Sequence, residues 1–285
     1  MLAIKNYIYI HSSRVEGDFV NGAELPIDPH NNMLMYNDGT YEDMLAYGTE
    51  VRHLPAHLTL LNNNLKRLNI KPPLLLYNPA SISENITRLL NKNRIFDSAH
   101  IRLSVYRSAN DSACLSIQSR PLPYRQYCYN ESGIVLSVLE NSPHPDAPLS
   151  LIRGANGTLN ALARQYAKSQ RADNCLMLNR FGRIADAIEA NMFIMHKNTL
   201  YTPSKREGCC PNVMRDLVLQ AAMRLGIAVQ HQVGLSLQAV LDADELFLAE
   251  PLCGITWAIA CLKQRYRHNT SQLIHNEISR LTFGG

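Results

Sequence analysis

Hydrophobic and polar residues alternate along several short stretches of this chain, a pattern typical of half-buried β-strands. The alternation covers residues 3–10, 17–20, 100–108, 113–122, 133–141, 191–203 and 244–250. Residues 100–108 and 113–122 read as two arms of one hairpin, and residues 191–203 read as a second hairpin that turns at Lys197–Asn198. Residues 24–38 carry two prolines and an Asn-Asn pair, which predicts a loop.

Other stretches carry apolar residues at a spacing of three and four, which predicts amphipathic helices. They are residues 55–70, 81–93, 158–173, 212–227, 237–243 and 270–281. Pro55 falls in the first turn of its helix, where the missing N–H costs nothing. Ser81 or Ser83 is the predicted N-cap of the second helix, and Gly226 ends the helix over 212–227.

Strands and helices are mixed in two unequal sets along the chain. Residues 121–131 hold two prolines and few apolar side chains, which indicates a linker. We therefore predict an α+β protein with an N-terminal lobe over 1–120, a linker over 121–131 and a C-terminal lobe over 132–285.

Composition narrows the class of protein further. The 285 residues are 46% hydrophobic and 18% charged, which excludes a disordered chain. No apolar run reaches the roughly 18–20 residues of a membrane span, so we expect no membrane partner. The net charge is only +4 and the basic residues are dispersed, so nucleic-acid binding is not expected either.

The seven cysteines form no CxxC pair, and their odd number fits free thiols in a reducing cytoplasm. His53 and His57 are four residues apart, but Pro55 separates them and no third ligand is near. We therefore predict no metal site. Common phosphate-binding, nucleophile-elbow and zinc-protease motifs are absent.

One ordered set of segments does carry a resemblance. Residues 36–44 (YNDGTYEDM), 57–70, 158–167 (TLNALARQYA), 179–203, 211–227 and 237–250 resemble, in order and spacing, the class IV aminotransferases. This is the fold-type IV pyridoxal-phosphate family of branched-chain and D-amino-acid aminotransferases and aminodeoxychorismate lyase. The resemblance implies a two-lobed fold, a homodimer and a cofactor held by a lysine Schiff base.

Several positions depart from what the resemblance requires. The family's cofactor lysine begins a Lys-x-Leu-Asn pattern, which here reads Gly157-Thr158-Leu159-Asn160. The phosphate-binding arginine positions read Leu45 and Leu60, and the second phosphate loop reads Ala249-Glu250-Pro251. Because these losses affect separate elements that serve one ligand, we expect no bound pyridoxal phosphate.

Other family positions keep suitable residues. Asp186 stands where the family has its ring-nitrogen carboxylate, and the amides of Val213 and Met214 begin the helix that receives the phosphate. Arg107 stands where some members bind a substrate carboxylate, and Tyr36 is a second candidate for substrate binding.

Three interpretations remain open. The first is a catalytically retired homologue that binds a small carboxylate or a partner subunit. The second is different chemistry in the same site, with Tyr106, Cys209 and Cys210 as further candidate groups. The third is an active aminotransferase or lyase that uses another lysine, such as Lys168 or Lys205.

Overall fold

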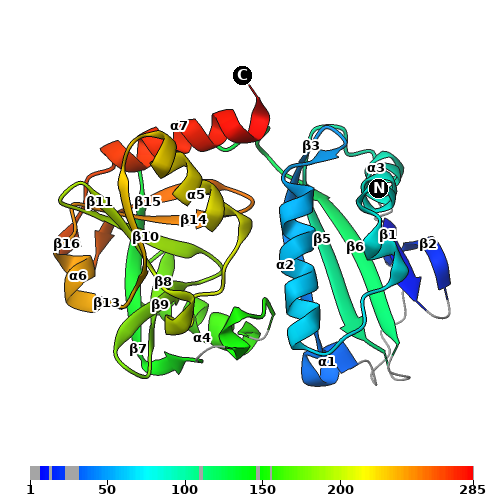
Figure 1. The fold of residues 1–285 in the computed structure, drawn as a ribbon, viewed down its shortest axis with the longest axis horizontal. Helices are drawn as coiled ribbons and strands as arrows, with labels where there is room; N and C mark the ends of the chain where they lie inside the picture. Colours follow the sequence, from blue (N-terminus) through cyan, green and yellow to red (C-terminus); the bar gives the residue numbers. More distant parts are fainter. Residues whose placement is uncertain are drawn as a thin grey trace. The chain divides into compact units, whose positions relative to one another are not determined.

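A computed structural model of the chain describes residues 7–12, 15–22, 32–108, 112–145, 148–154 and 156–284. The chain is an α+β protein that divides into two compact units, Met1–Gln126 and Tyr127–Gly285. The boundary between the two units, after Gln126, falls within residues 121–131, the stretch that the sequence analysis describes as a linker. Figure 1 shows each unit as a sheet with helices packed against it.

The first unit contains a six-stranded antiparallel sheet in the order β2-β1-β6-β5-β3-β4. The strands are β1 (Tyr7–Ser12), β2 (Val15–Asn21), β3 (Gly39–Tyr47), β4 (Glu50–Val51), β5 (Ser98–Arg107) and β6 (Ala113–Pro121). The two arms predicted over 100–108 and 113–122 form the β5–β6 hairpin, as the alternation indicated.

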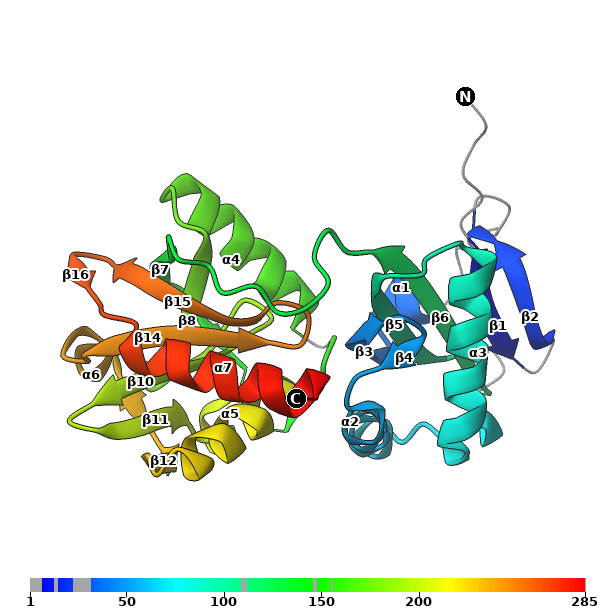
Figure 2. The same cartoon turned by 90° about the horizontal axis from the view of Figure 1, so that it is seen from above.

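The helical elements of this unit are α1 (Asn32–Tyr36), α2 (Leu54–Arg67), the 3₁₀ turn η2 (Leu74–Tyr77) and α3 (Pro79–Lys92). Helix α2 packs on β3, and α3 packs on β1 and β6 (Figure 2). Of the leucines at 58, 61, 65 and 68, whose spacing predicted this helix, the first three are buried and Leu68 packs half-buried against the same core. The cap prediction for α3 was wrong: Asn78 Oδ1 accepts hydrogen bonds from Ala80 N and Ser81 N, because Pro79 starts the helix earlier.

Period-two alternation gives the first sheet two different faces. Met44, Ile101, Leu103, Leu115 and Ile117 are among the buried residues of the core that also contains the apolar sides of α2 and α3. The neighbouring residues along the same strands point to the opposite face. That second face carries the polar and charged side chains described below.

The second unit contains a mixed ten-stranded sheet in the order β12-β11-β10-β14-β15-β7-β8-β9-β13, with β16 paired to β15. The strands are β7 (Ile134–His144), β8 (Asn174–Asn179), β9 (Arg183–Ala187), β10 (Asn191–His196), β11 (Thr199–Pro203), β12 (Ala228–Val233), β13 (Leu235–Ser236), β14 (Glu245–Glu250), β15 (Gly254–Cys261) and β16 (Gln264–Arg265). Lys197 and Asn198 both have positive φ, as a two-residue hairpin turn between β10 and β11 requires.

The helical elements of the second unit are η3 (Leu149–Leu151), α4 (Gly157–Ser169), η4 (Lys205–Glu207), α5 (Val213–Arg224), α6 (Leu237–Leu241) and α7 (Asn269–Phe283). Helix α4 packs on β7 and β8, whereas α5 contacts β14, β12 and α7. Figure 2 shows α5 and β12 side by side. None of the helices in the described ranges is long and apolar enough to cross a membrane.

The loop prediction for residues 24–38 was partly wrong. Residues 32–36 form helix α1, although Leu34, Met35 and Tyr36 are all exposed. A five-residue helix with no buried side chain has no amphipathic pattern for sequence periodicity to detect. Residues 24–31 lie outside the described part of the chain.

Candidate functional site

Gly157, the residue that the sequence analysis predicts at the lysine position, is the first residue of α4. It follows Asn156, and an added Cβ at Gly157 would meet no atom within 4 Å. A Cβ therefore has room at this position.

The second unit has four lysines, and all four are exposed. They are Lys168, Lys197, Lys205 and Lys263. Lys168 lies in the last turn of α4, and Lys205 is the first residue of η4. Neither candidate for a replacement lysine has its side chain in the buried region around Asp186.

Asp186 lies on β9 and is 4% exposed. Its Oδ1 accepts a 3.1 Å hydrogen bond from Asn191 Nδ2, and its Oδ2 accepts a 2.9 Å bond from Cys210 N. Burial raises the pKa of Asp186 to about 7, while these hydrogen bonds and the positive charge of Arg215 oppose the rise. Near neutral pH the carboxyl is therefore only partly ionised, and both oxygens already have donors.

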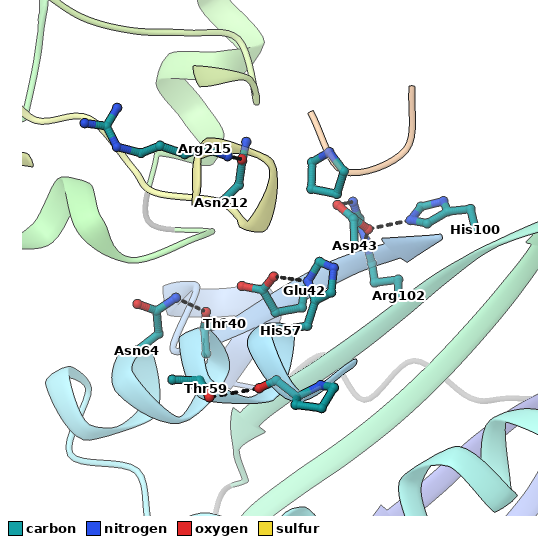
Figure 3. A network of polar contacts seen from close by, with 12 residues as sticks. Thr40, Glu42, Asp43, His57, Thr59, Asn64, His100, Arg102, Asn212 and Arg215 are labelled. Atoms are coloured by element: carbon teal, nitrogen blue, oxygen red, sulfur yellow. Dashed lines mark hydrogen bonds and ion pairs between the residues drawn. The ribbon is translucent and has the colours of Figure 1, made fainter. Parts of the chain in front are cut away.

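The start of α5 is held by Asn212. Its Oδ1 accepts from Arg215 N at 2.9 Å (Figure 3), and its Nδ2 donates to the Ala249 carbonyl at 3.1 Å. Val213 and Met214, which follow it, are buried. The bond to Ala249 brings the neighbouring Glu250–Pro251 segment to this helix end. Proline supplies no amide donor, and a glutamate carboxylate repels a phosphate dianion.

Arg107, predicted to bind a substrate carboxylate, lies at the end of β5 and is engaged within its own unit. Its Nε donates to Asp38 Oδ2 at 2.8 Å, and its Nη2 donates to the Leu68 carbonyl at 2.9 Å. The second predicted substrate residue, Tyr36, is 71% exposed on α1. The contacts of Arg107 tie the start of β3 to the end of α2.

Sequence reasoning missed a charged cluster on the face of the first sheet opposite α2 and α3. It consists of Asp43, His100, Arg102 and Arg120, from β3, β5 and β6. Arg120 Nε donates to His100 Nδ1 at 2.6 Å, so that nitrogen carries no proton. His100 Nε2 then carries the proton and donates to Asp43 Oδ1 at 2.5 Å (Figure 3). His100 is therefore neutral in this arrangement.

The cluster carries more positive than negative charge. Arg102 forms a two-bond fork with Asp43, at 2.8 and 2.9 Å, and its guanidinium lies 4.3 Å from the centre of the Tyr41 ring. Within the described ranges, Arg120 forms no ion pair, and its one hydrogen bond goes to the neutral imidazole. Asp43 thus balances one of two guanidinium charges.

A cavity of about 230 Å³ opens beside this cluster. It is lined by Ile8, His100, Arg102, Gln118, Ser119 and Arg120. Two guanidinium groups and an amide supply donors for a small anion, and a carboxylate matches the planar guanidinium fork. The alternation in residues 100–108 and 113–122 places 100, 102, 118 and 120 on one face. Sequence alone did not show that Asp43 joins them, because that requires the pairing of β3 with β5.

A separate buried pair lies between the first sheet and helix α2, which packs on β3. His57 Nδ1 lies 2.8 Å from Glu42 Oε2, with the two side chains 3% and 2% exposed (Figure 3). His57 therefore has a carboxylate partner within the core. In the described ranges, no group of three or more His, Cys, Asp or Glu residues is arranged to hold a metal ion.

Comparison with known proteins gives a consistent result. The sequence profile described as amino-transferase class IV matches residues 39–257. A putative branched-chain-amino-acid aminotransferase of Methanocaldococcus jannaschii is 26% identical over 247 residues, covering 82% of each chain. An aminodeoxychorismate lyase of Bacillus subtilis is 24% identical over 256 residues, covering 85% of this chain and 83% of the relative.

Solved structures agree on the fold. A branched-chain aminotransferase of Thermoproteus uzoniensis with norvaline superimposes with a TM-score of 0.86 at 20% identity, covering 98% of this chain and 95% of the other. The Escherichia coli branched-chain amino acid aminotransferase gives 0.84 at 19% identity, covering 98% and 94%. The predicted fold is confirmed, and this chain belongs to the class IV aminotransferase family.

Proposed function

We propose that this chain is a catalytically retired class IV aminotransferase homologue that forms no Schiff base with pyridoxal phosphate. One observation carries the proposal. Gly157, which the family resemblance puts at the lysine position, has room for a Cβ, while every lysine of the second unit is exposed. An aldimine needs a lysine amine at the cofactor, and among the residues that the structure describes no buried lysine supplies one.

Two further features support the same conclusion. A protonated pyridine nitrogen is stabilised by an ionised carboxylate, but burial raises the pKa of Asp186 to about 7 and both oxygens have donors already. The segment beside the start of α5 contains Glu250 and Pro251, which oppose an incoming phosphate. The residues present therefore do not fit the cofactor as the family holds it.

We propose that the retained binding activity is toward a small carboxylate. The support is the excess positive charge at Arg102 and Arg120 and the cavity that both side chains line. Arg107 stays a weaker candidate for this role, since Asp38 already engages its guanidinium. From the family resemblance, we further propose a homodimer in the cytoplasm, with light scattering as the test of the dimer.

Cofactor chemistry is tested by incubating the protein with pyridoxal phosphate, reducing with borohydride and measuring the intact mass. We expect no phosphopyridoxyl adduct on the folded protein, and no transfer of an amino group from branched-chain or D-amino acids to 2-oxoglutarate. An adduct on Lys168 or Lys205 together with turnover would instead support an active enzyme with a relocated lysine. Turnover without an adduct would indicate different chemistry in the same site.

Carboxylate binding is tested by calorimetric titration with succinate. We expect Arg120→Ala to weaken binding about tenfold, because one charge-assisted hydrogen bond contributes about 1.5 kcal/mol or more. Lys71→Ala is the matched control, since Lys71 is an exposed cation of the same unit away from the cavity lining. Equal affinities for the two variants would reject the Arg120 site.

A further inference from the structure

A second cationic cavity lies in the second unit, and its lining includes neither Asp186 nor Gly157. Its volume is about 440 Å³, and it is lined by Ser204, Lys205, Arg206, Arg215, Asp216, Leu219, His231 and Gln232. These residues come from η4, the first two turns of α5 and the edge strand β12. Figure 2 shows α5 and β12 adjacent at this side of the unit.

Arg215 places a buried positive charge at this cavity. Its side chain is 2% exposed, and its hydrogen bonds go to neutral acceptors. The acceptors are Thr202 Oγ1, Cys209 Sγ, the Pro203 carbonyl at 2.8 Å and the His231 carbonyl at 3.3 Å. No carboxylate of the described residues forms an ion pair with it. Asp186 lies within the electrostatic range of this guanidinium, but the hydrogen-bond partners of Arg215 are neutral, so a positive potential remains at the cavity.

Two exposed cations line the same cavity. In the part of the chain that the structure describes, neither Lys205 nor Arg206 forms an ion pair. Their backbone is nevertheless fixed: Ser204 Oγ accepts from Arg206 N at 3.1 Å, and Ser204 N donates to the Val233 carbonyl at 2.9 Å. The segment is thereby fastened to the residues that end β12, so the two side chains extend from a defined position.

The charges at this cavity do not balance. Asp216 is the single carboxylate of the lining, against the cations of Lys205, Arg206 and Arg215. The excess of two positive charges matches a phosphate dianion, and Ser204, His231 and Gln232 add polar groups for its oxygens. The cavity is larger than a single small ion requires. The remaining space, beside the apolar Leu219 side chain, has room for a small organic group.

We propose that this cavity binds the phosphate group of a small phosphorylated molecule. The lining takes Arg215 and Asp216 from the first turn of α5 but not Asn212, Val213 or Met214, and it shares no residue with the carboxylate cavity of the first unit. It does not depend on the proposed function, because neither the loss of the Schiff base nor the Arg120 site enters the argument. The buried Arg215 guanidinium adds a positive potential at the cavity, and the exposed Lys205 and Arg206 side chains contact the phosphate oxygens.

The test is calorimetric titration of the full chain with inorganic phosphate and with glycerol 3-phosphate. We expect saturable binding of both, weakened at least about tenfold by Lys205→Ala combined with Arg206→Ala. Asp216→Asn removes the opposing carboxylate and is expected to tighten binding several-fold. Lys263→Ala is the control, since Lys263 is exposed on the β15–β16 turn and does not line the cavity.

The outcomes separate the alternatives. Absence of saturable phosphate binding overturns the proposal, as does binding that the double variant leaves unchanged. Equal affinity for succinate and phosphate, with both weakened by the double variant, also contradicts a phosphate site. Arg120→Ala leaves phosphate affinity unchanged if the two cavities are independent, so loss of phosphate binding in that variant would place the ion in the first unit.

Discussion

Asn191 Nδ2 donates a 3.1 Å hydrogen bond to Asp186 Oδ1, which joins the start of β10 to the end of β9 within the buried part of the second unit. The same amide group contacts the Cys210 carbonyl at 2.7 Å, and Asn191 Oδ1 accepts from Asn212 N at 3.1 Å. One side chain therefore links the buried carboxyl to the start of α5.

The protonation of Asp186 predicts a pH-dependent stability. Its pKa is raised to about 7 in the folded protein, compared with about 4 in an unfolded chain. Between those values the folded state holds a proton that the unfolded state has released. The stability contributed by this group is therefore greatest below pH 4 and falls as pH rises to 7.

Comparison with Asp186→Asn isolates this contribution. We expect the free energy of unfolding of the wild type, relative to the variant, to fall by the order of 2–4 kcal/mol from pH 4 to 7.5 in urea titrations. Asp242→Asn, at an exposed aspartate after α6, should show no such trend. A relative stability that rises with pH would mean that the Asp186 carboxyl is ionised in the fold.

Gly157→Lys tests how many elements of the cofactor site are lost. The position has open space, so we expect the variant to fold with a stability close to that of Gly157→Ala. We also expect no yellow colour after addition of pyridoxal phosphate and desalting, because Glu250 and Pro251 remain beside the start of α5. A stable aldimine in the variant would show that the lysine was the single missing part.

His57→Leu tests the buried pair in the first unit. Removing the imidazole leaves the Glu42 carboxylate in the core without its 2.8 Å partner. We expect a loss of about 2–4 kcal/mol in the free energy of unfolding. Thr59→Ala, two residues along the exposed side of α2, should change stability by less than about 1 kcal/mol. Equal effects would mean that the pair contributes little.

His100 acts on the carboxylate cavity by positioning Arg120. We expect His100→Leu to weaken succinate binding about three- to tenfold, because it removes the acceptor that holds Arg120 Nε. His100→Gln restores an acceptor and is expected to recover part of the affinity. A loss of stability with unchanged succinate affinity in His100→Leu would assign the residue a purely structural role.

The sequence predicted most of the fold because local patterns were strong. The leucine spacing in α2 and the alternation in β5 and β6 each reflect one apolar face, and the structure buries those faces. Helix α1 was missed because it has no buried residue and so no apolar face. The N-cap of α3 was assigned to Ser81 or Ser83, but Asn78 is the capping residue.

The candidate sites were harder to predict because they combine residues that are distant along the chain. Asp43 joins His100 only through the pairing of β3 with β5, across 57 positions. Arg107 was selected by family position, yet its guanidinium bonds to Asp38, 69 positions away. Periodicity indicates the face on which a side chain lies, but partners across strands depend on sheet order.

The most direct test of the central claim is the absorbance spectrum of the purified protein, recorded as isolated and again after incubation with pyridoxal phosphate and desalting. A protein without a lysine at the cofactor position is predicted to retain no band of a lysine aldimine in either sample. A retained aldimine band that borohydride abolishes, with a matching increase in intact mass, would contradict the claim and show a working substitute lysine.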